Sequence, residues 1–100
     1  MGPAITPTQF IGDPMNLNMS LWVNDEQVQV SNTSQMIFSV QEQIEFLSSR
    51  ITMLPGDVIL TGTPAGVGYA RTPPVFMKPG DICEIEIESI GVLSNSIADE

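Results

Sequence analysis

The chain has 100 residues, of which 42% are hydrophobic and 15% are charged. Because disordered chains combine low hydrophobicity with strong charge, we predict a folded chain with a core near the lower size limit of an independent domain. Its net charge of −9 argues against nucleic acid as a partner. No apolar run approaches the roughly 20 residues that span a bilayer, and a single cysteine suits a reducing compartment, so we expect a cytoplasmic protein without a membrane partner.

The first half of the chain predicts a β-hairpin followed by a helix. Three prolines in residues 1–14 disfavour regular structure there. Residues 17–23 alternate apolar with mainly polar side chains, residues 24–26 have turn composition, and residues 27–30 alternate glutamine with valine, which together predict the hairpin. Trp22 falls on the polar face, and we interpret it as a packing residue rather than a ligand platform.

The predicted helix begins at a recognisable cap. Ser39 and Glu42 have the spacing of a capping box, a hydroxyl followed three residues later by a carboxylate. Apolar residues at positions 40, 44, 47 and 51 recur with a helical period. We therefore predict one helix from Val40 to Ser49 or Arg50, which acts as a packing element.

Residues 54–68 read Leu-Pro-Gly-Asp-Val-Ile-Leu-Thr-Gly-Thr-Pro-Ala-Gly-Val-Gly. Pro-Gly-Asp is turn chemistry, and the apolar run at residues 58–60 is too short for a helix, so it is interpreted as a buried strand. The loop after it contains Thr61, Gly62, Thr63 and Pro64. Glycine-rich loops at strand ends can present N–H groups and hydroxyls to a small oxyanion. The local residues by themselves nevertheless favour an ordinary buried strand followed by a purely structural loop.

A second Pro-Gly-Asp turn at residues 79–81 leads into a strand in which Glu84, Glu86 and Glu88 alternate with Cys83 and isoleucines. We interpret the carboxylates as a solvated strand face in preference to a Mg²⁺ or Ca²⁺ site, and Cys83 as a buried structural thiol. Residues 92–97 supply a final short strand.

Arg71 is the only charged residue of the loop at residues 66–74. A guanidinium group binds carboxylates with two hydrogen bonds, so this arginine could meet a substrate carboxylate. Exposed loop arginines are common, however, and we favour an ordinary surface role for Arg71.

Four segments, residues 23–26, 32–39, 54–68 and 73–81, together resemble the fumarylacetoacetate hydrolase family. The likeness is to its smaller bacterial-type members, which act on 2-oxo acids, acylpyruvates and hydroxymuconate-like dioates. It extends from Gly2 to about Ile97 and covers the C-terminal half of the family's catalytic domain. We therefore expect residues 1–100 to be the C-terminal portion of a single catalytic domain.

The resemblance implies a mainly β fold with one α-helix, part of the family's mixed β-roll. It implies Mg²⁺, or Mn²⁺ or Ca²⁺, held by a Glu-x-Glu pair and an aspartate that lie upstream of this chain, as do a substrate-facing lysine and a histidine. No catalytic residue or metal ligand is therefore assigned within the chain. Gly62 and Thr63 match the family's substrate-contacting pair, and Thr61 and Pro64 flank it. Asn32, Thr33 and Ser34 fall near the family's active site, although such side chains often bond their own backbone, the reading that we favour.

Two functions follow from this resemblance. The first is a portion of a metal-dependent enzyme that hydrolyses, isomerises or decarboxylates 2-oxo or 1,3-diketo carboxylates through a metal-stabilised enolate. Its partners would be the small substrate and further copies of the protein, as a homodimer or larger assembly. The alternative is a catalytically inactive, truncated module that only folds or self-associates.

Overall fold

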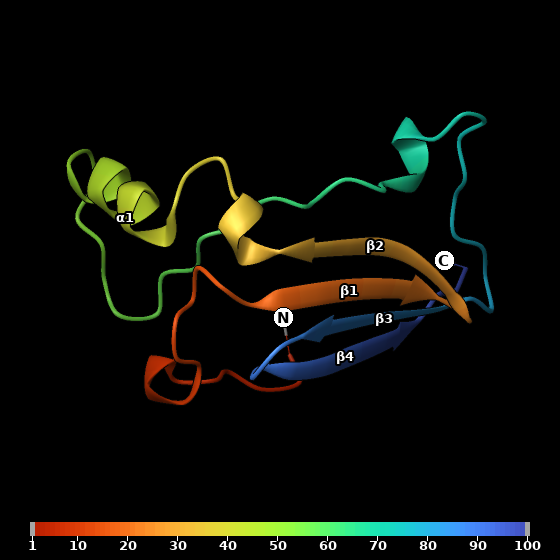
Figure 1. Ribbon diagram of the computed structural model, residues 1–100, viewed down its shortest axis with the longest axis horizontal. Helices are drawn as coiled ribbons and strands as arrows, with labels where there is room; N and C mark the ends of the chain where they lie inside the picture. Colours follow the sequence, from red (N-terminus) through yellow and green to blue (C-terminus); the bar gives the residue numbers. More distant parts are fainter. Residues whose placement is uncertain (1, 100) are drawn as a thin grey trace.

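The computed structural model describes residues 2–99, which form a four-stranded antiparallel sheet and a single α-helix (Figure 1). The strands are β1 (Asn18–Val23), β2 (Glu26–Asn32), β3 (Ile82–Ile87) and β4 (Gly91–Ser96), in the order β2-β1-β3-β4. The helix α1 (Val40–Ser48) lies in the long connection between β2 and β3. The mainly β fold with one helix is as predicted. Short 3-10 helices complete the regular structure: η1 (Thr8–Phe10), η2 (Thr33–Gln35) and η3 (Gly68–Ala70).

The sheet has one apolar and one polar face, which we call the inner and the outer face. Residues that pair directly across two antiparallel strands share a face. The inner face carries three such pairs from β1 and β3: Met19 with Ile87, Leu21 with Ile85, and Val23 with Cys83. The outer face carries Ser20 opposite Glu86 and Trp22 opposite Glu84. The predicted separation of the β3 carboxylates from Cys83 and the isoleucines is confirmed.

The β1–β2 hairpin is present as predicted, but β2 contains an extra residue. Leu21 pairs with Gln29 whereas Trp22 pairs with Gln27, so Val28 has no partner of its own and forms a β-bulge. The bulge reverses the alternation along the rest of the strand. Gln29 lies on the inner face with 9% exposure, whereas Val30 is 66% exposed. The simple alternation expected for residues 27–30 is therefore wrong.

Helix α1 begins where the sequence predicts. The hydroxyl of Ser39 accepts a hydrogen bond from the Glu42 N–H at 3.2 Å, and the Ser39 N–H donates to the Glu42 carboxylate at 2.7 Å. The Ser39 N–H, and after it the Ser39 hydroxyl, hold the pKa of the Glu42 carboxyl below its ordinary value. The helix lies away from the sheet (Figure 1). Its Ile44 and Phe46 side chains are exposed. Of the predicted apolar stripe, Val40 and Leu47 are half-buried and Ile44 and Ile51 are exposed, so residues 2–99 fulfil the predicted packing role only in part.

The buried strand predicted at residues 58–60 is wrong. The turn before it forms as expected, with Gly56 at φ +100° and the Asp57 carboxylate accepting the Leu54 N–H at 2.8 Å. The residues that follow pair with no strand in the described part of the chain, and Leu60 is 93% exposed. A short apolar segment becomes a strand only when a neighbour satisfies its backbone groups, and residues 2–99 offer none here.

A polar cluster joins the turn of the first hairpin to the start of β3. The Asn24 amide donates to the Asp81 carboxylate at 3.0 Å and accepts from the Ile82 N–H at 3.0 Å. The second oxygen of Asp81 accepts the Lys78 N–H at 2.8 Å, which closes the second Pro-Gly-Asp turn. The Asn24 amide, and after it the Lys78 N–H, lower the pKa of the Asp81 carboxyl.

Few apolar side chains are buried among residues 2–99. Leu17, at 5% exposure, is the buried hydrophobic residue of the described part, and many large apolar side chains elsewhere are exposed. Cys83 is a free, half-buried thiol rather than a fully buried one. Across residues 2–99, no helix has the length and apolar character needed to cross a bilayer.

Replacing Asn24 by glycine should raise the pKa of Asp81 toward its ordinary value of 3.8, because the amide is the main cause of its lowering. Glycine also tolerates the positive φ of 54° at this position. Because the folded pKa is lowered, the stabilisation from Asp81 is complete above the ordinary value and is lost as the pH falls through the lowered one. Carboxyl NMR titration measures the shift; an unchanged Asp81 pKa in the variant would contradict the assignment.

Candidate functional site

The loop that contains Thr61 to Pro64 is fixed to β2 by one buried side chain. The Gln29 side-chain amide donates to the Pro64 carbonyl at 2.8 Å, to the Thr63 hydroxyl at 3.1 Å and to the Ala65 carbonyl at 3.2 Å. Gln29 reaches the loop because the bulge at Val28 turns it onto the inner face. The position of the loop therefore depends on the register of the first hairpin.

Glycine at position 66 allows the loop to lie directly on the strand. Gly66 has φ +106°, a conformation that side chains rarely adopt. A Cβ atom added there would collide with the Val28 carbonyl oxygen and lie 3.0 Å from Cγ of Gln29. Both the backbone conformation and the close approach require glycine.

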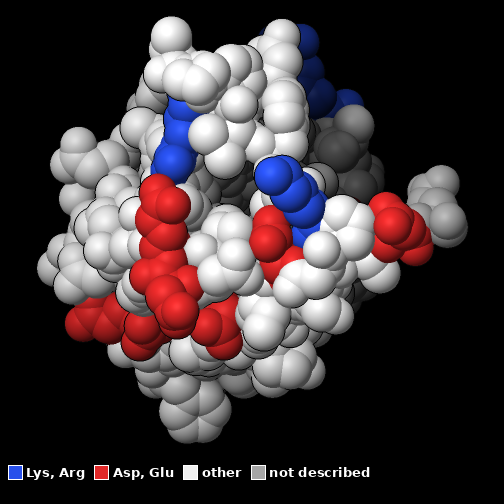
Figure 2. Space-filling model, turned by 90° about the vertical axis from the view of Figure 1, so that its right-hand side faces the viewer, with Lys and Arg blue, Asp and Glu red and all other residues white. Residues whose placement is uncertain are grey.

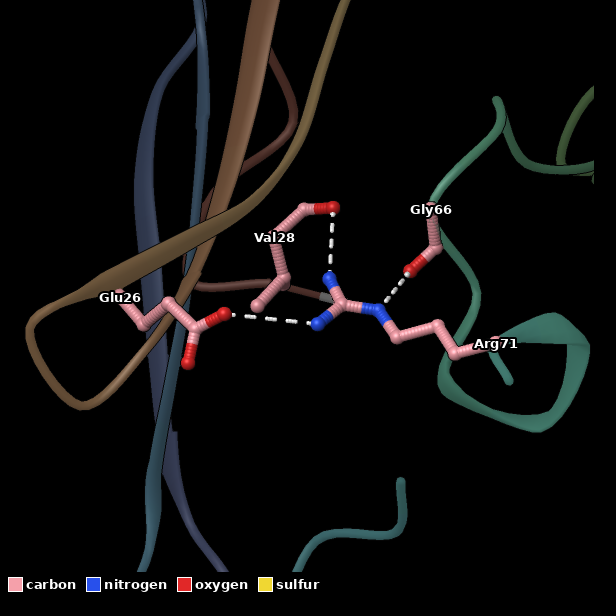
Figure 3. A network of polar contacts seen from close by, with 4 residues as sticks. All are labelled: Glu26, Val28, Gly66 and Arg71. Atoms are coloured by element: carbon pink, nitrogen blue, oxygen red, sulfur yellow. Dashed lines mark hydrogen bonds and ion pairs between the residues drawn. The ribbon is translucent and has the colours of Figure 1, made fainter. Parts of the chain in front are cut away.

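Arg71 also binds both Val28 and Gly66, the two residues whose backbones meet here (Figure 3). Its guanidinium donates to the Val28 carbonyl at 3.1 Å and to the Gly66 carbonyl at 3.3 Å. Its remaining nitrogen forms an ion pair with the Glu26 carboxylate at 3.4 Å. All three nitrogens thus bind the chain's own groups, which favours the structural role over the binding of a substrate carboxylate.

A hollow of about 600 Å³ lies between this loop and the inner face. Thr63 lines it, whereas Thr61, Gly62 and Pro64 do not. The lining is largely apolar and includes Tyr69 and Phe76, whose ring centroids are 6.4 Å apart. Its charged members are Lys78 and the ion pair of Arg71 with Glu26. Such a hollow suits a small molecule with an apolar body and one or two anionic groups.

Thr61, Gly62 and Thr63 are exposed, and the N–H groups of Gly62 and Thr63 have no acceptor within residues 2–99. Gly62 has φ +92° with open space around it. A hydroxyl and unpaired N–H groups in one short loop are the donors that a small oxyanion needs. Thr63 is the member of the predicted set that joins this loop to the hollow.

The polar turn before α1 bonds the chain itself, as we favoured. The Asn32 side chain accepts the Ser34 N–H at 2.9 Å, and the Thr33 hydroxyl accepts the Leu17 N–H at 2.9 Å. These contacts tie the end of β2 to the segment before β1. They assign these side chains a structural function.

The outer face carries a separate, acidic hollow of about 480 Å³. Its lining comprises Trp22, Asn24, Asp25, Glu84, Glu86 and Val92. Figure 2 shows acidic side chains gathered on the end of the molecule that carries the β1–β2 turn. Within residues 2–99, however, no three His, Cys, Asp or Glu side chains are arranged to hold a metal ion. The residues described here therefore do not fit the divalent metal that the resemblance implies.

Comparisons with known proteins identify the family. The sequence profile described as "Fumarylacetoacetate (FAA) hydrolase C-terminal" matches residues 1–98. The mitochondrial oxaloacetate tautomerase Fahd2a of Rattus norvegicus is 50% identical over 97 residues, which are 97% of this chain and 31% of that protein. The chain belongs to the fumarylacetoacetate hydrolase family, and it spans about a third of the length of the relatives that it matches.

Solved structures agree with this assignment. Maleylpyruvate hydrolase from Sphingobium sp. SYK-6, in complex with manganese(II) and pyruvate, superimposes with a TM-score of 0.85 at 38% identity over 97% of this chain and 34% of its own. The 2-hydroxyhepta-2,4-diene-1,7-dioate isomerase from Mycobacterium marinum does so with a TM-score of 0.74 at 44% identity over 86% of this chain and 31% of its own. The mainly β fold of this chain is therefore the fold of the family's C-terminal part.

The sequence reasoning missed Gln29, the residue on which the loop depends. Periodicity placed it in an alternating strand, and no local pattern announces a bulge of one residue. The one available signal was its amide side chain, which needs hydrogen-bond partners wherever it is buried, but Gln27 in the same strand has the same side chain. A contact to a loop more than thirty residues away in sequence is visible only in the folded chain.

Gly66→Ala should destabilise the chain more than Gly62→Ala. Both glycines have a left-handed φ, whose cost for alanine is of order 1–3 kcal/mol, but only at position 66 does the added Cβ meet backbone. Urea unfolding followed by circular dichroism measures both free energies of unfolding. Equal losses for the two variants would show that the contact with Val28 contributes nothing.

Proposed function

We propose that this chain is the substrate-binding part of an enzyme that acts on small oxo acids. The single observation that supports it most directly is the loop at residues 61–64, in which an exposed Thr63 hydroxyl is fixed by Gln29 beside unpaired N–H groups. In the intact enzyme, these donors would bind a carboxylate or an oxygen on which negative charge develops.

The names of the relatives support the substrate class. They are an oxaloacetate tautomerase, a maleylpyruvate hydrolase solved with pyruvate, and a dioate isomerase. Their substrates share a small carbon skeleton, at least one carboxylate and an oxo or enol group. The largely apolar hollow with Thr63 and Lys78 in its lining suits such a molecule.

The proposed chemistry proceeds through an enolate, the species common to carbon–carbon cleavage, isomerisation and decarboxylation next to an oxo group. Preorganised donors stabilise charge as it develops and need no rearrangement during the reaction. The manganese in the maleylpyruvate hydrolase structure makes a divalent cation plausible in the intact enzyme. Because residues 2–99 offer no set of ligands, we propose that its ligands lie outside this chain.

The test uses a hybrid enzyme in which this chain replaces the matching third of the rat oxaloacetate tautomerase. Thr63→Val should lower kcat/KM for oxaloacetate roughly ten- to a hundredfold, since a hydrogen bond to a charged group contributes about 1.5–3 kcal/mol. Steady-state kinetics of the hybrid and its variants provide the measurement.

Thr63→Ser is the matched control, because it keeps the hydroxyl and removes only a methyl group. It should retain most of the activity of the hybrid. A Thr63→Val hybrid with unchanged kcat/KM would remove Thr63 from the substrate site and, with it, the proposed function.

A second proposal concerns association. Large apolar side chains such as Ile37, Leu60 and Tyr69 are exposed, and exposed apolar surface of this extent favours contact with further protein. We propose that the isolated chain self-associates as a homodimer or larger assembly. This outcome is compatible with the inactive alternative, in which the chain folds and associates without catalysis.

Sedimentation velocity at increasing protein concentration should show a species heavier than the monomer. Leu60→Ser, which makes a 93% exposed residue polar, should shift the equilibrium toward monomer. Val30→Ser, on the outer face, is the matched control for lost surface hydrophobicity. A monomer at all concentrations would contradict this proposal.

A further inference from the structure

We propose that Gln29 is a positioning residue that makes the Thr63 hydroxyl a hydrogen-bond donor toward an anionic substrate. The inference rests on the proposed function, in which Thr63 contacts substrate. It adds Gln29, a residue of β2, to the proposed substrate site, and it states that the Thr63 hydroxyl proton points toward the substrate. The argument depends on which end of the Gln29 amide faces the loop.

The orientation of that amide is determined by its partners. The carbonyl oxygens of Pro64 and Ala65 lie 2.8 and 3.2 Å from the Gln29 side-chain nitrogen. A carbonyl oxygen only accepts hydrogen bonds. If the amide were flipped, its oxygen would face both carbonyls without a proton between them. The NH₂ end of Gln29 must therefore point at the loop.

This orientation sets the role of the Thr63 hydroxyl. Its oxygen lies 3.1 Å from the Gln29 nitrogen and accepts a hydrogen bond from it. Because the nitrogen has two protons and three acceptors, one proton is shared between the Thr63 hydroxyl and a loop carbonyl. The Gln29 oxygen is 3.5 Å away, at the far limit of a hydrogen bond. A hydroxyl that accepts from one partner keeps its own proton for another acceptor. Thr63 is exposed and lines the hollow, so that acceptor can be a bound anion.

The surroundings keep this arrangement in place before any ligand binds. Gln29 is 9% exposed, so few other rotamers are open to it. Gly66 lies on the backbone beside it, and Arg71 binds the carbonyls of Val28 and Gly66. A donor held in its working direction loses little entropy on binding.

The experiment is a double-mutant cycle in the hybrid enzyme with oxaloacetate as the probe. Gln29→Met keeps the length of the side chain and removes its donors. If Gln29 acts through the Thr63 hydroxyl, Gln29→Met should lower kcat/KM about tenfold. In the Thr63→Val background it should then produce no further loss, because the group that it positions is gone.

Gln27→Met is the matched control. Gln27 lies two residues away on the outer face, is exposed, and donates to the Ser20 hydroxyl at 3.2 Å. It touches neither the loop nor the hollow, so its variant should keep the kcat/KM of the unmodified hybrid.

The pH dependence of kcat/KM in Gln29→Glu distinguishes a positioning role from a purely structural one. An ionised carboxylate only accepts, so it would face the Pro64 and Ala65 carbonyls unfavourably and take the Thr63 proton for itself. A protonated carboxyl group can donate again. The kcat/KM of this variant, relative to that of the hybrid with Gln29, should therefore rise as the pH falls toward 5.

The outcomes separate the two proposals. Unchanged kcat/KM in Thr63→Val overturns the proposed function. Two results would overturn the positioning role alone, provided that Thr63→Val lowers kcat/KM. In the first, the losses of kcat/KM from Gln29→Met and Thr63→Val add in the double variant. In the second, Gln29→Met lowers kcat/KM no more than Gln27→Met does. Circular dichroism shows whether each variant is folded. Should Gln29→Met fail to fold, the pH profile of Gln29→Glu decides: a profile parallel to that of the hybrid overturns the role, and recovery in acid supports it.

Discussion

The extra residue in β2 is the feature on which the rest of the candidate site depends. A bulge leaves one residue of a strand outside the ladder, and here that residue is Val28. Its carbonyl accepts a hydrogen bond from Arg71 and forms the surface against which Gly66 lies. The next residue, Gln29, is rotated onto the inner face and holds the Thr63 loop. The bulge at Val28 thus places both the carbonyl that Arg71 and Gly66 contact and the Gln29 side chain that binds the loop.

The same arrangement separates the charges of the chain. Glu84 and Glu86 lie on the outer face, across the sheet from the hollow that contains Thr63. Lys78 lies on the side of the hollow, and Arg71 is neutralised by Glu26. Because like charges repel over about 8 Å at physiological salt, an anionic ligand in this hollow benefits from lying on the face opposite Glu84 and Glu86. The carboxylate that does line the hollow, that of Glu26, is paired with Arg71. A chain with a net charge of −9 can therefore still offer a site suited to an anion.

Two apolar segments of the chain have few contacts with the rest of the described residues. At residues 58–60 the chain pairs with no strand of the described part, and Val58 and Leu60 are exposed. Helix α1 lies away from the sheet (Figure 1). Both features are ordinary in a chain that spans about a third of the length of its relatives. The Thr63 loop differs from these two segments. It is held in place by residues of the same chain, namely Gln29, Gly66 and Arg71.

Interactions between near neighbours were readable from the sequence alone. The capping box at Ser39, both Pro-Gly-Asp turns and the alternation in β3 are formed by residues at most a few positions apart, so their spacing carries the information. The family resemblance pointed to Gly62 and Thr63 by their place in a motif, and their contact with substrate stays a prediction. Only the tertiary structure decided that Gln29 is buried and that residues 58–60 remain unpaired. Both outcomes depend on which distant backbone or side chain meets the segment, and the periodicity of a strand contains no record of that partner.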